Sequence, residues 1–421
     1  MNNIKILSIL LLLFIGLTGY SQSTISGSVT DSKGNSLPYT NVYWKKALEG
    51  TLSNLEGNFK LSSSTKNKDT LCVELLGFEV KYLPAAQITS PLKVALNPKA
   101  FELKELVVKP QPPTYYIKQA VKETPKNLDT NAFSQKSYYR EIIKENGAVN
   151  RMAEAILLSK NFNGVSTKTD SIHISIKHGR KASDQETIAF MQGYVEKQRE
   201  KEVKKLKRKG EEIPEELKEE GGAQIDLGGP KYLLMRNFLL EPSEFLDSTQ
   251  FKYYDYMFDE YITYKGRPTT VIKFTQKDNV RKPLFDGKVY IDDWDKAFSV
   301  LEFELSEKGK KHIIPAYYKP LMWAFGIGVE APDIKIQVFG KKIGKYWYVD
   351  YFHLEGGFTA TKSHWFKDDE VSTFQVDQLL KVQSFDENIE NQLFNFPKFK
   401  KGSLFDQIEN TKDSFWENFK L

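Results

Sequence analysis

The sequence has only one cysteine, five histidines and little excess of charge of either sign in its 421 residues. A single cysteine excludes a disulfide framework and any zinc site built on cysteines. The 60 lysines and arginines nearly balance the 55 aspartates and glutamates, which argues against a nucleic-acid partner. Aromatic residues, in contrast, make up 13% of the chain, and hydrophobic residues 40%. This composition indicates a globular protein rich in β-structure, and the length predicts two or three domains.

Only one long hydrophobic run is present, and it lies at the N-terminus. Lys5 precedes the apolar run Ile6–Leu17, and the small residues Gly19 and Ser21 follow it. The run is too short to span the ~30 Å hydrocarbon layer of a bilayer. A basic start, a short apolar run and small residues are typical of a secretory signal peptide. We therefore expect residues 1–22 to be a signal peptide, cleaved near Ser21, and the protein to be exported.

From residue 23 to residue 109 short β-type runs alternate with turn residues. The runs cover residues 25–29, 41–44, 58–61, 71–75, 92–96 and 106–108. Strands at such close spacing predict a small β-sandwich. Gly34 and Gly57 fit turn positions with positive φ, while Phe59, Leu61 and Cys72 are predicted to face the core.

Four short motifs follow one another in this region. They are Gly27–Asp31, Leu37–Pro38, Glu56–Phe59 and Leu76–Phe78. Together they resemble the carboxypeptidase-regulatory-like domain. The resemblance implies a prealbumin-like sandwich of the kind found in envelope proteins of Gram-negative bacteria, often ahead of TonB-dependent barrels. With the signal peptide, it implies the periplasm or the periplasmic face of the outer membrane.

Beyond a proline-rich linker at residues 110–114, residues 115–385 are predicted to form one antiparallel-sheet domain. Tyr116–Thr124 has a helical pattern that is expected to end at Pro125. Strand-like runs follow at residues 137–144, 152–159, 172–176, 253–264, 270–274, 288–292, 299–303, 334–338 and 346–351. Neighbouring runs joined by short turns predict an antiparallel meander. The expected fold class is therefore mainly β, a sandwich followed by a larger antiparallel curved sheet with helical insertions.

Two segments of the chain are predicted to be helical rather than extended. In the insertion at residues 183–220, residues 196–209 have eight basic and three acidic side chains, and residues 211–220 have six acidic and one basic. Because these charges cancel, a charged helical hairpin is favoured over a nucleic-acid-binding arm. The tail at residues 386–421 is predicted to form short amphipathic helices that pack on the body.

Two further resemblances concern the second domain. Asp286–Asp292 with Phe298–Phe303 is similar to lipoprotein-carrier and outer-membrane-lipoprotein-sorting proteins. That resemblance implies a curved, unclosed barrel that holds acyl chains, and it implies no catalytic residue. Tyr138–Glu141 with Ala153–Ala155 resembles the segment that follows the sandwich in large uncharacterised envelope proteins.

Motifs of the common hydrolases and nucleotide-binding proteins are missing from the sequence. None of His173, His178, His312, His353 and His364 begins a His-x-x-Glu zinc motif. The chain also has no Gly-x-Ser-x-Gly, no phosphate-binding loop and no Gly-x-Gly-x-x-Gly turn. We therefore predict no catalytic residue and no cofactor.

Two groups of residues have side chains of the kind that can bind a metal ion. His173 and His178 lie five positions apart in a predicted strand, which places their side chains on opposite faces. Asp292, Asp293 and Asp295 lack the glycine that a calcium-binding loop requires, and a turn with solvated carboxylates is favoured. The prediction is that neither group binds a metal.

Residues 320–329 form an apolar, glycine-containing loop between predicted strands. Loops normally lie at the surface, where an apolar patch marks a site for a ligand, a membrane or a partner. The alternative is a loop that folds inward and plugs the concave face of the sheet. The candidate ligand-binding residues are Leu321, Met322, Trp323, Phe325 and Ile327.

The leading hypothesis is an exported, non-catalytic cell-envelope protein whose curved sheet binds an apolar, lipid-like ligand or an envelope partner. An alternative is an outer-membrane β-barrel or TonB-receptor-like component, because spanning strands need only ~9–11 residues. Lysines and glutamates on both faces of the predicted strands, as in Ile334–Gln337 beside Glu302–Glu304, argue against that alternative. The second alternative is a hydrolase with an unrecognised site, which the missing motifs disfavour.

Overall fold

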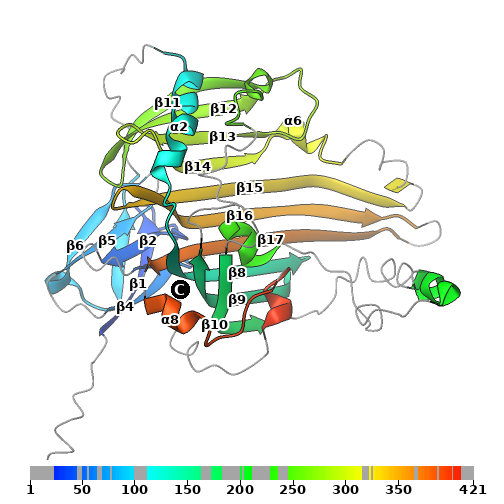
Figure 1. The fold of residues 1–421 in the computed structure, drawn as a ribbon, viewed down its shortest axis with the longest axis horizontal. Helices are drawn as coiled ribbons and strands as arrows, with labels where there is room; N and C mark the ends of the chain where they lie inside the picture. Colours follow the sequence, from blue (N-terminus) through cyan, green and yellow to red (C-terminus); the bar gives the residue numbers. More distant parts are fainter. Residues whose placement is uncertain are drawn as a thin grey trace, which may run out of the picture. The chain divides into compact units, whose positions relative to one another are not determined.

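The computed structural model of the chain forms two compact units, one within residues 1–102 and one within residues 103–414 (Figure 1). It describes residues 23–44, 50–54, 56–63, 69–75, 78–98, 111–162, 172–182, 200–201, 203–210, 228–235, 245–314, 322–323, 326–364, 368–385, 388–400 and 402–408. The expected signal peptide, the run at residues 106–108, most of the insertion at residues 183–220 and the tail beyond residue 408 lie outside these ranges.

The N-terminal unit is a sandwich of two small sheets with the strand orders β4-β1-β7 and β3-β2-β5-β6. Its strands are β1 (Ser23–Asp31), β2 (Asn41–Trp44), β3 (Gly50–Leu52), β4 (Asn58–Ser63), β5 (Thr70–Glu74), β6 (Lys81–Pro84) and β7 (Leu92–Leu96). Side chains of both sheets share one core, and the predicted core positions Phe59, Leu61 and Cys72 are at most 4% exposed. The predicted β-sandwich is therefore confirmed, and β3 and β6 are strands that the sequence pattern did not predict.

Two turn glycines of the sandwich differ in the space around them. Gly34 and Gly57 both have positive φ, +87° and +76°. A Cβ at Gly57 would lie 2.4 Å from the carbonyl oxygen of Val29, whereas a Cβ at Gly34 would meet nothing within 4 Å. Gly34→Ala should therefore cost only the ~1–2 kcal/mol of left-handed backbone strain. Gly57→Ala should cost about 3 kcal/mol or more, because β1 must also move. Urea-induced unfolding of the two variants measures the difference, and equal losses would contradict the expected clash.

The second unit contains one ten-stranded sheet in the order β10-β9-β8-β17-β16-β15-β14-β13-β12-β11. Its strands are β8 (Phe133–Glu145), β9 (Ala148–Asn161), β10 (Ile172–Ala182), β11 (Tyr254–Tyr264), β12 (Arg267–Gln276), β13 (Phe285–Asp292), β14 (Phe298–Leu305), β15 (Ile327–Ile343), β16 (Tyr346–Lys362) and β17 (Glu370–Phe385). All neighbouring strands are antiparallel. The mainly β fold with a larger antiparallel curved sheet is thus confirmed. Its two meanders, β8–β10 and β11–β17, join where β8 pairs with β17.

One face of this sheet holds the main core, and two helices pack on it. Ile117 and Ala120 of α2 (Pro113–Asn127) and Leu233 of α5 (Gly229–Met235) are buried in the same cluster as side chains of most strands. Figure 1 shows both helices in front of the sheet. Among the described residues, no helix has the length and apolar character needed to cross a membrane.

The α2 helix corrects two sequence expectations. Pro113, placed in the linker from sequence, is the first helical residue, since the fixed φ of proline suits this position and the first amide of a helix has no partner. The helix also continues through Pro125 to Asn127 rather than ending at the proline. Thr124 donates its hydroxyl to the carbonyl of Ala120 at 2.9 Å, and Pro125 lies close enough to the end that few hydrogen bonds are lost.

The C-terminal segment, as far as it is described, packs on the sheet. The short elements of the chain are η1 (Ala85–Gln87), η3 (Phe251–Tyr253), α6 (Glu307–Lys310), α8 (Asn388–Leu393) and η5 (Phe405–Gln407). Leu393 of α8 packs against Leu158, while Leu404 is fully buried in the main core. The buried carboxylate of Glu141 accepts hydrogen bonds from the hydroxyl of Ser403 at 2.5 Å and the amide of Phe405 at 3.0 Å.

Candidate functional site

The main core of the second unit continues along β15–β17 as a row of apolar side chains that are only half-buried. This apolar strip consists of Ile327, Val329, Ile334, Leu354, Phe358 and Val376. The strand pairing places all six side chains on the core face, because residues directly opposite one another share a face. Ile334 and Leu354 contact the core cluster itself. The six side chains of the strip are therefore half-buried on this face, whereas Ala360 and Phe374, on the same face, are buried.

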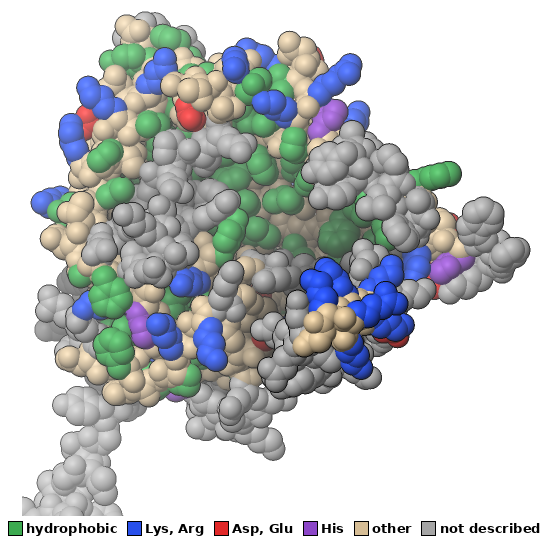
Figure 2. Space-filling model, turned by 45° about the vertical axis from the view of Figure 1, so that its right-hand side comes forward, with side chains coloured by type: hydrophobic (Ala, Val, Ile, Leu, Met, Phe, Trp, Pro, Cys, Tyr) green, Lys and Arg blue, Asp and Glu red, His purple; other side chains and the backbone are tan. Residues whose placement is uncertain are grey.

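The middle of the strip has no side chain, because a glycine occupies that position. Gly356 of β16 lies between Ile334 of β15 and Val376 of β17 in a row across three strands. A Cβ at Gly356 would lie 2.5 Å from the carbonyl oxygen of Asp333, so no larger residue fits there without a backbone shift. Figure 2 brings this end of the sheet forward and shows hydrophobic side chains gathered in a hollow of the surface. The arrangement can hold an apolar group against the sheet.

Trp323 stands at the open end of the strip. The side chain is 85% exposed, so it is not packed into the core. The Trp323 carbonyl accepts a hydrogen bond from the amide of Gly326 at 3.0 Å, and the Gly326 carbonyl accepts one from the amide of Ser363 at 2.7 Å. This turn ties the tryptophan backbone to the end of β16, next to Ile327.

The structure describes two of the four other candidate ligand-binding residues. Met322 is half-buried beside Trp323, and Ile327 is a member of the strip. Leu321 and Phe325 lie outside the described residues. The expected loop at residues 320–329 is shorter than the sequence suggests, because Ile327–Val329 pair with Ala360–Lys362 and belong to β15.

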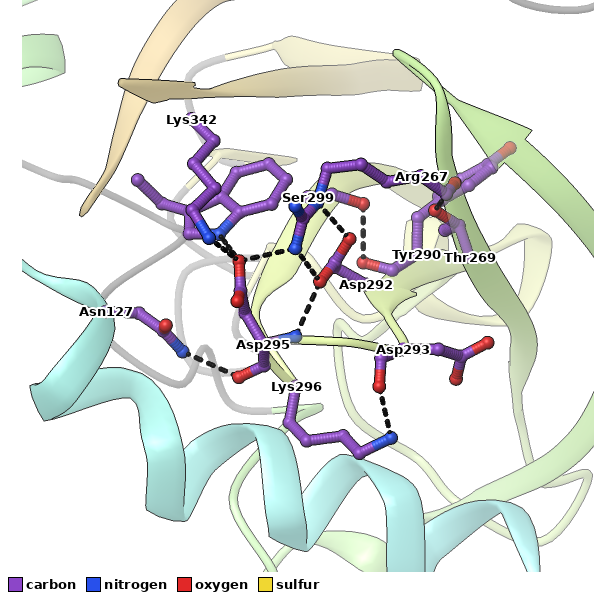
Figure 3. A network of polar contacts seen from close by, with 11 residues as sticks. Asn127, Arg267, Thr269, Tyr290, Asp292, Asp293, Asp295, Lys296, Ser299 and Lys342 are labelled. Carbon is purple, nitrogen blue, oxygen red and sulfur yellow. Dashed lines mark hydrogen bonds and ion pairs between the residues drawn. The ribbon is translucent and has the colours of Figure 1, made fainter. Parts of the chain in front are cut away.

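At the turn between β13 and β14 two carboxylates and two cations form a closed network (Figure 3). Arg267 donates from Nε and Nη2 to the two oxygens of Asp292 at 2.6 and 2.7 Å, and from Nη2 to Asp295 at 2.6 Å. Asp295 also accepts hydrogen bonds from Lys342 Nζ at 2.6 Å and from Trp347 Nε1 at 3.0 Å. Burial opposes ionisation of Asp295, but these two donors and the charge of Arg267 hold the pKa of Asp295 below its ordinary value.

This network corrects the expectation of a turn with solvated carboxylates. Residues 292–295 do form a turn, but Asp292 is fully buried. The sequence could not show this, because the neutralising groups come from β12, β15 and β16. Two negative and two positive charges balance, and both oxygens of Asp292 and the Oδ2 atom of Asp295 accept hydrogen bonds. The network therefore stabilises the turn.

The histidines also depart from the sequence analysis. A β-bulge between Ile176 and His178 shifts the pairing of β10, so that His173 lies opposite Lys160 and His178 opposite Ile156. These partners lie four residues apart on β9, so both histidines are on the same face rather than on opposite faces. They are still ~13 Å apart along the strand, too far to share a metal ion. Within the described ranges, no group of three or more histidine, cysteine, aspartate or glutamate residues could hold a metal ion.

His353 belongs to a buried polar chain that was not expected. Its Nε2 lies 2.9 Å from Asp377 Oδ2, and Arg140 Nη2 donates to Asp377 Oδ1 at 2.9 Å. Burial opposes the ionisation of Asp377, but the hydrogen bond from His353 and the charge of Arg140 lower the pKa of Asp377 to about 2. These hydrogen bonds link β8, β16 and β17, so His353 has a structural role in the sheet.

Sequence reasoning missed most of the apolar strip. Phe358, Val376 and Leu354 are separated in sequence and come together through the pairing of three strands. A signal was available in the alternation of Phe352, Leu354 and Phe358 along β16, which marks one apolar face. Its accessibility could not be read from that pattern.

Part of the chain matches a known family, and two solved structures are distant neighbours of the chain. Residues 25–108 match the family model of the CarboxypepD_reg-like domain. No curated protein matches the chain. A DUF1329 family protein from Desulfovibrio piger is 9% identical with a TM-score of 0.21, over 65% of this chain and 94% of that one. A domain described as that of an outer membrane lipoprotein-sorting protein, from Vibrio parahaemolyticus, is 9% identical with a TM-score of 0.19, over 66% and 99%.

The second structure is of the class that Asp286–Asp292 with Phe298–Phe303 resembles in sequence. The order of turn glycines and apolar residues in the sandwich gave the correct family for the N-terminal part. Residues 25–108 of this chain form a carboxypeptidase-regulatory-like domain.

Proposed function

We propose that this protein is an exported, non-catalytic component of the cell envelope, on the periplasmic side, that binds an apolar, lipid-like ligand in the hollow of its ten-stranded sheet. One observation carries the proposal: a half-buried apolar strip that continues the core face and ends at an exposed tryptophan. Partly exposed apolar side chains that gather on one surface mark a site for a ligand, a membrane or a partner.

The chemistry of the strip defines the class of ligand. Isoleucine, valine, leucine and phenylalanine side chains offer no hydrogen bond, so affinity must come from removing apolar surface from water, at ~25 cal/mol per Å². A saturated acyl chain fits that requirement. An elongated strip along three strands also suits a chain better than a compact ligand.

Removing the tryptophan should weaken ligand binding without unfolding the protein. Burial of Trp323 against an acyl chain contributes on the order of 2 kcal/mol, so Trp323→Ala should lower the affinity for a fluorescent fatty-acyl probe about 30-fold. Because the side chain is 85% exposed, the melting temperature should hardly change. Probe titration and thermal unfolding of the same variant measure both effects.

Trp294 provides the matched control. It is also an exposed tryptophan, at 64%, but it lies at the turn between β13 and β14, away from the strip. Trp294→Ala should leave probe affinity unchanged. Equal losses for the two variants, or normal probe binding by Trp323→Ala, would remove Trp323 from the binding site.

The natural ligand can be sought directly. Native mass spectrometry of the protein purified from its own envelope should show a copurified lipid that is missing from the same protein refolded after organic extraction. A protein that carries no such mass and binds no acyl probe would overturn the proposed function.

A further inference from the structure

A short lysine-rich helix has a strongly basic surface. Its described residues are 200–201 and 203–209. The cations Lys201, Lys204, Lys205, Lys207, Arg208 and Lys209 are all exposed. Glu200, 3.6 Å from Lys204, is the one carboxylate among these described positions. Val203 and Leu206, one turn apart, are half-buried, so this helix is amphipathic with a basic outer surface.

The helix lies at the same end of the second unit as the hollow. In Figure 1 it is the green helix on the right, beyond the ends of β15 and β16 where Trp323 and Ile327 lie. Figure 2 brings that side forward and shows a group of lysine and arginine side chains beside the apolar hollow. An exposed tryptophan, an apolar strip and a basic helix therefore share one end of the unit.

We propose that this end of the protein docks on the surface of an anionic lipid bilayer, with the basic helix against the headgroups and the hollow open to the membrane. The proposal rests on the proposed function, because it supplies the route by which an apolar ligand enters the hollow. Lysine and arginine side chains near an anionic bilayer each add about a fivefold gain in binding. Tryptophan favours the interface between headgroups and hydrocarbon, which is the position that Trp323 would take.

An alternative binding partner for the basic helix is the acidic run that follows it in the same chain. Residues 211–220 have six acidic side chains and follow directly in the sequence, outside the described residues. If that run neutralises the helix, the protein should ignore lipid charge. The exposure of all six described cations and their place beside the hollow favour the membrane.

Cosedimentation of the exported protein with vesicles tests the proposal. We expect binding to vesicles of equal parts phosphatidylglycerol and phosphatidylcholine, weak binding to phosphatidylcholine alone, and loss of binding as salt is added. The triple variant Lys204→Glu, Lys205→Glu, Arg208→Glu should bind the anionic vesicles on the order of 100-fold more weakly. A control triple variant, Lys93→Glu, Lys122→Glu, Lys273→Glu, changes the net charge equally at exposed positions of other elements and should bind normally.

Three outcomes would overturn the docking proposal. They are equal binding to both kinds of vesicle, equal losses in the two triple variants, or binding that appears only after residues 211–220 are neutralised. Probe titration without vesicles separates this result from the proposed function. A helix variant that loses vesicle binding but keeps probe affinity supports docking, whereas wild-type protein that binds probe but not anionic vesicles disproves docking alone.

Discussion

Replacing Arg267 with methionine is expected to lower the free energy of unfolding of the second unit by about 3–5 kcal/mol. Asp292 is fully buried, and Arg267 donates to both of its oxygens. Methionine keeps much of the side-chain length but removes every donor, so a buried carboxylate remains without its cation. Leaving one charge of a buried pair unpaired costs far more than the net contribution of the intact pair.

Two comparison variants isolate this effect. Lys335→Met removes an ion pair with Glu355 at 3.1 Å in which both side chains are about half exposed, and it should cost less than about 1 kcal/mol. Adding Asp292→Asn to Arg267→Met should recover part of the loss, because the uncompensated charge is gone. Urea-induced unfolding measures all three, and similar midpoints for Arg267→Met and Lys335→Met would contradict the buried-pair account.

Asp350→Asn should be comparably damaging at neutral pH. Asp350 is 6% exposed as a side chain and holds Lys265 at 2.9 Å and Lys381 at 3.0 Å, each on a different oxygen. Its removal leaves Lys381, itself buried, without its anion, and a loss of about 3–5 kcal/mol is expected. Asp333→Asn is the control, because Asp333 is exposed and its loss leaves no buried charge.

The pH dependence of this variant follows from the same contacts. Burial would raise the pKa of Asp350, but the charges of Lys265, Lys381 and Lys341 outweigh it and hold that pKa well below its ordinary value. Such a carboxylate contributes stability above its unfolded pKa, near 4, and loses it as the pH falls through the folded value. The gap in unfolding free energy between wild type and Asp350→Asn should therefore be largest at neutral pH and shrink below about pH 4. A gap that widens in acid would contradict the ion-pair assignment.

Local features of the sequence correctly predicted the sandwich and most strands. Gly34 and Gly57 have the positive φ that their turns require, and the apolar alternation of Phe59 and Leu61 places both in the core. These features depend only on neighbouring residues, through backbone conformation and the two-residue period of a strand. The same period located every strand of the large sheet except β17, although the predicted ends were several residues off.

The candidate site was only partly accessible to the same reasoning. The sequence identified an apolar segment at Trp323, and the structure shows that side chain exposed at the end of a half-buried strip. The floor of the strip, with Phe358 and Val376, was not identified. Its residues are distant in sequence. Alternation predicts an apolar face of a strand, but the exposure of that face depends on which helices pack against it.

Properties that depend on pairing between distant strands were decided only by the tertiary structure. Arg140 and Asp377, which lie 237 positions apart, meet because β8 pairs with β17. A bulge of one residue moved His178 to the face of His173, which no strict alternation can predict. Asp292 is buried rather than solvated because Arg267 of β12 reaches it. The local sequence determines which residues are extended and which side chains share a face of a strand. Register, bulges and burial depend on contacts between segments that come together only when the chain folds.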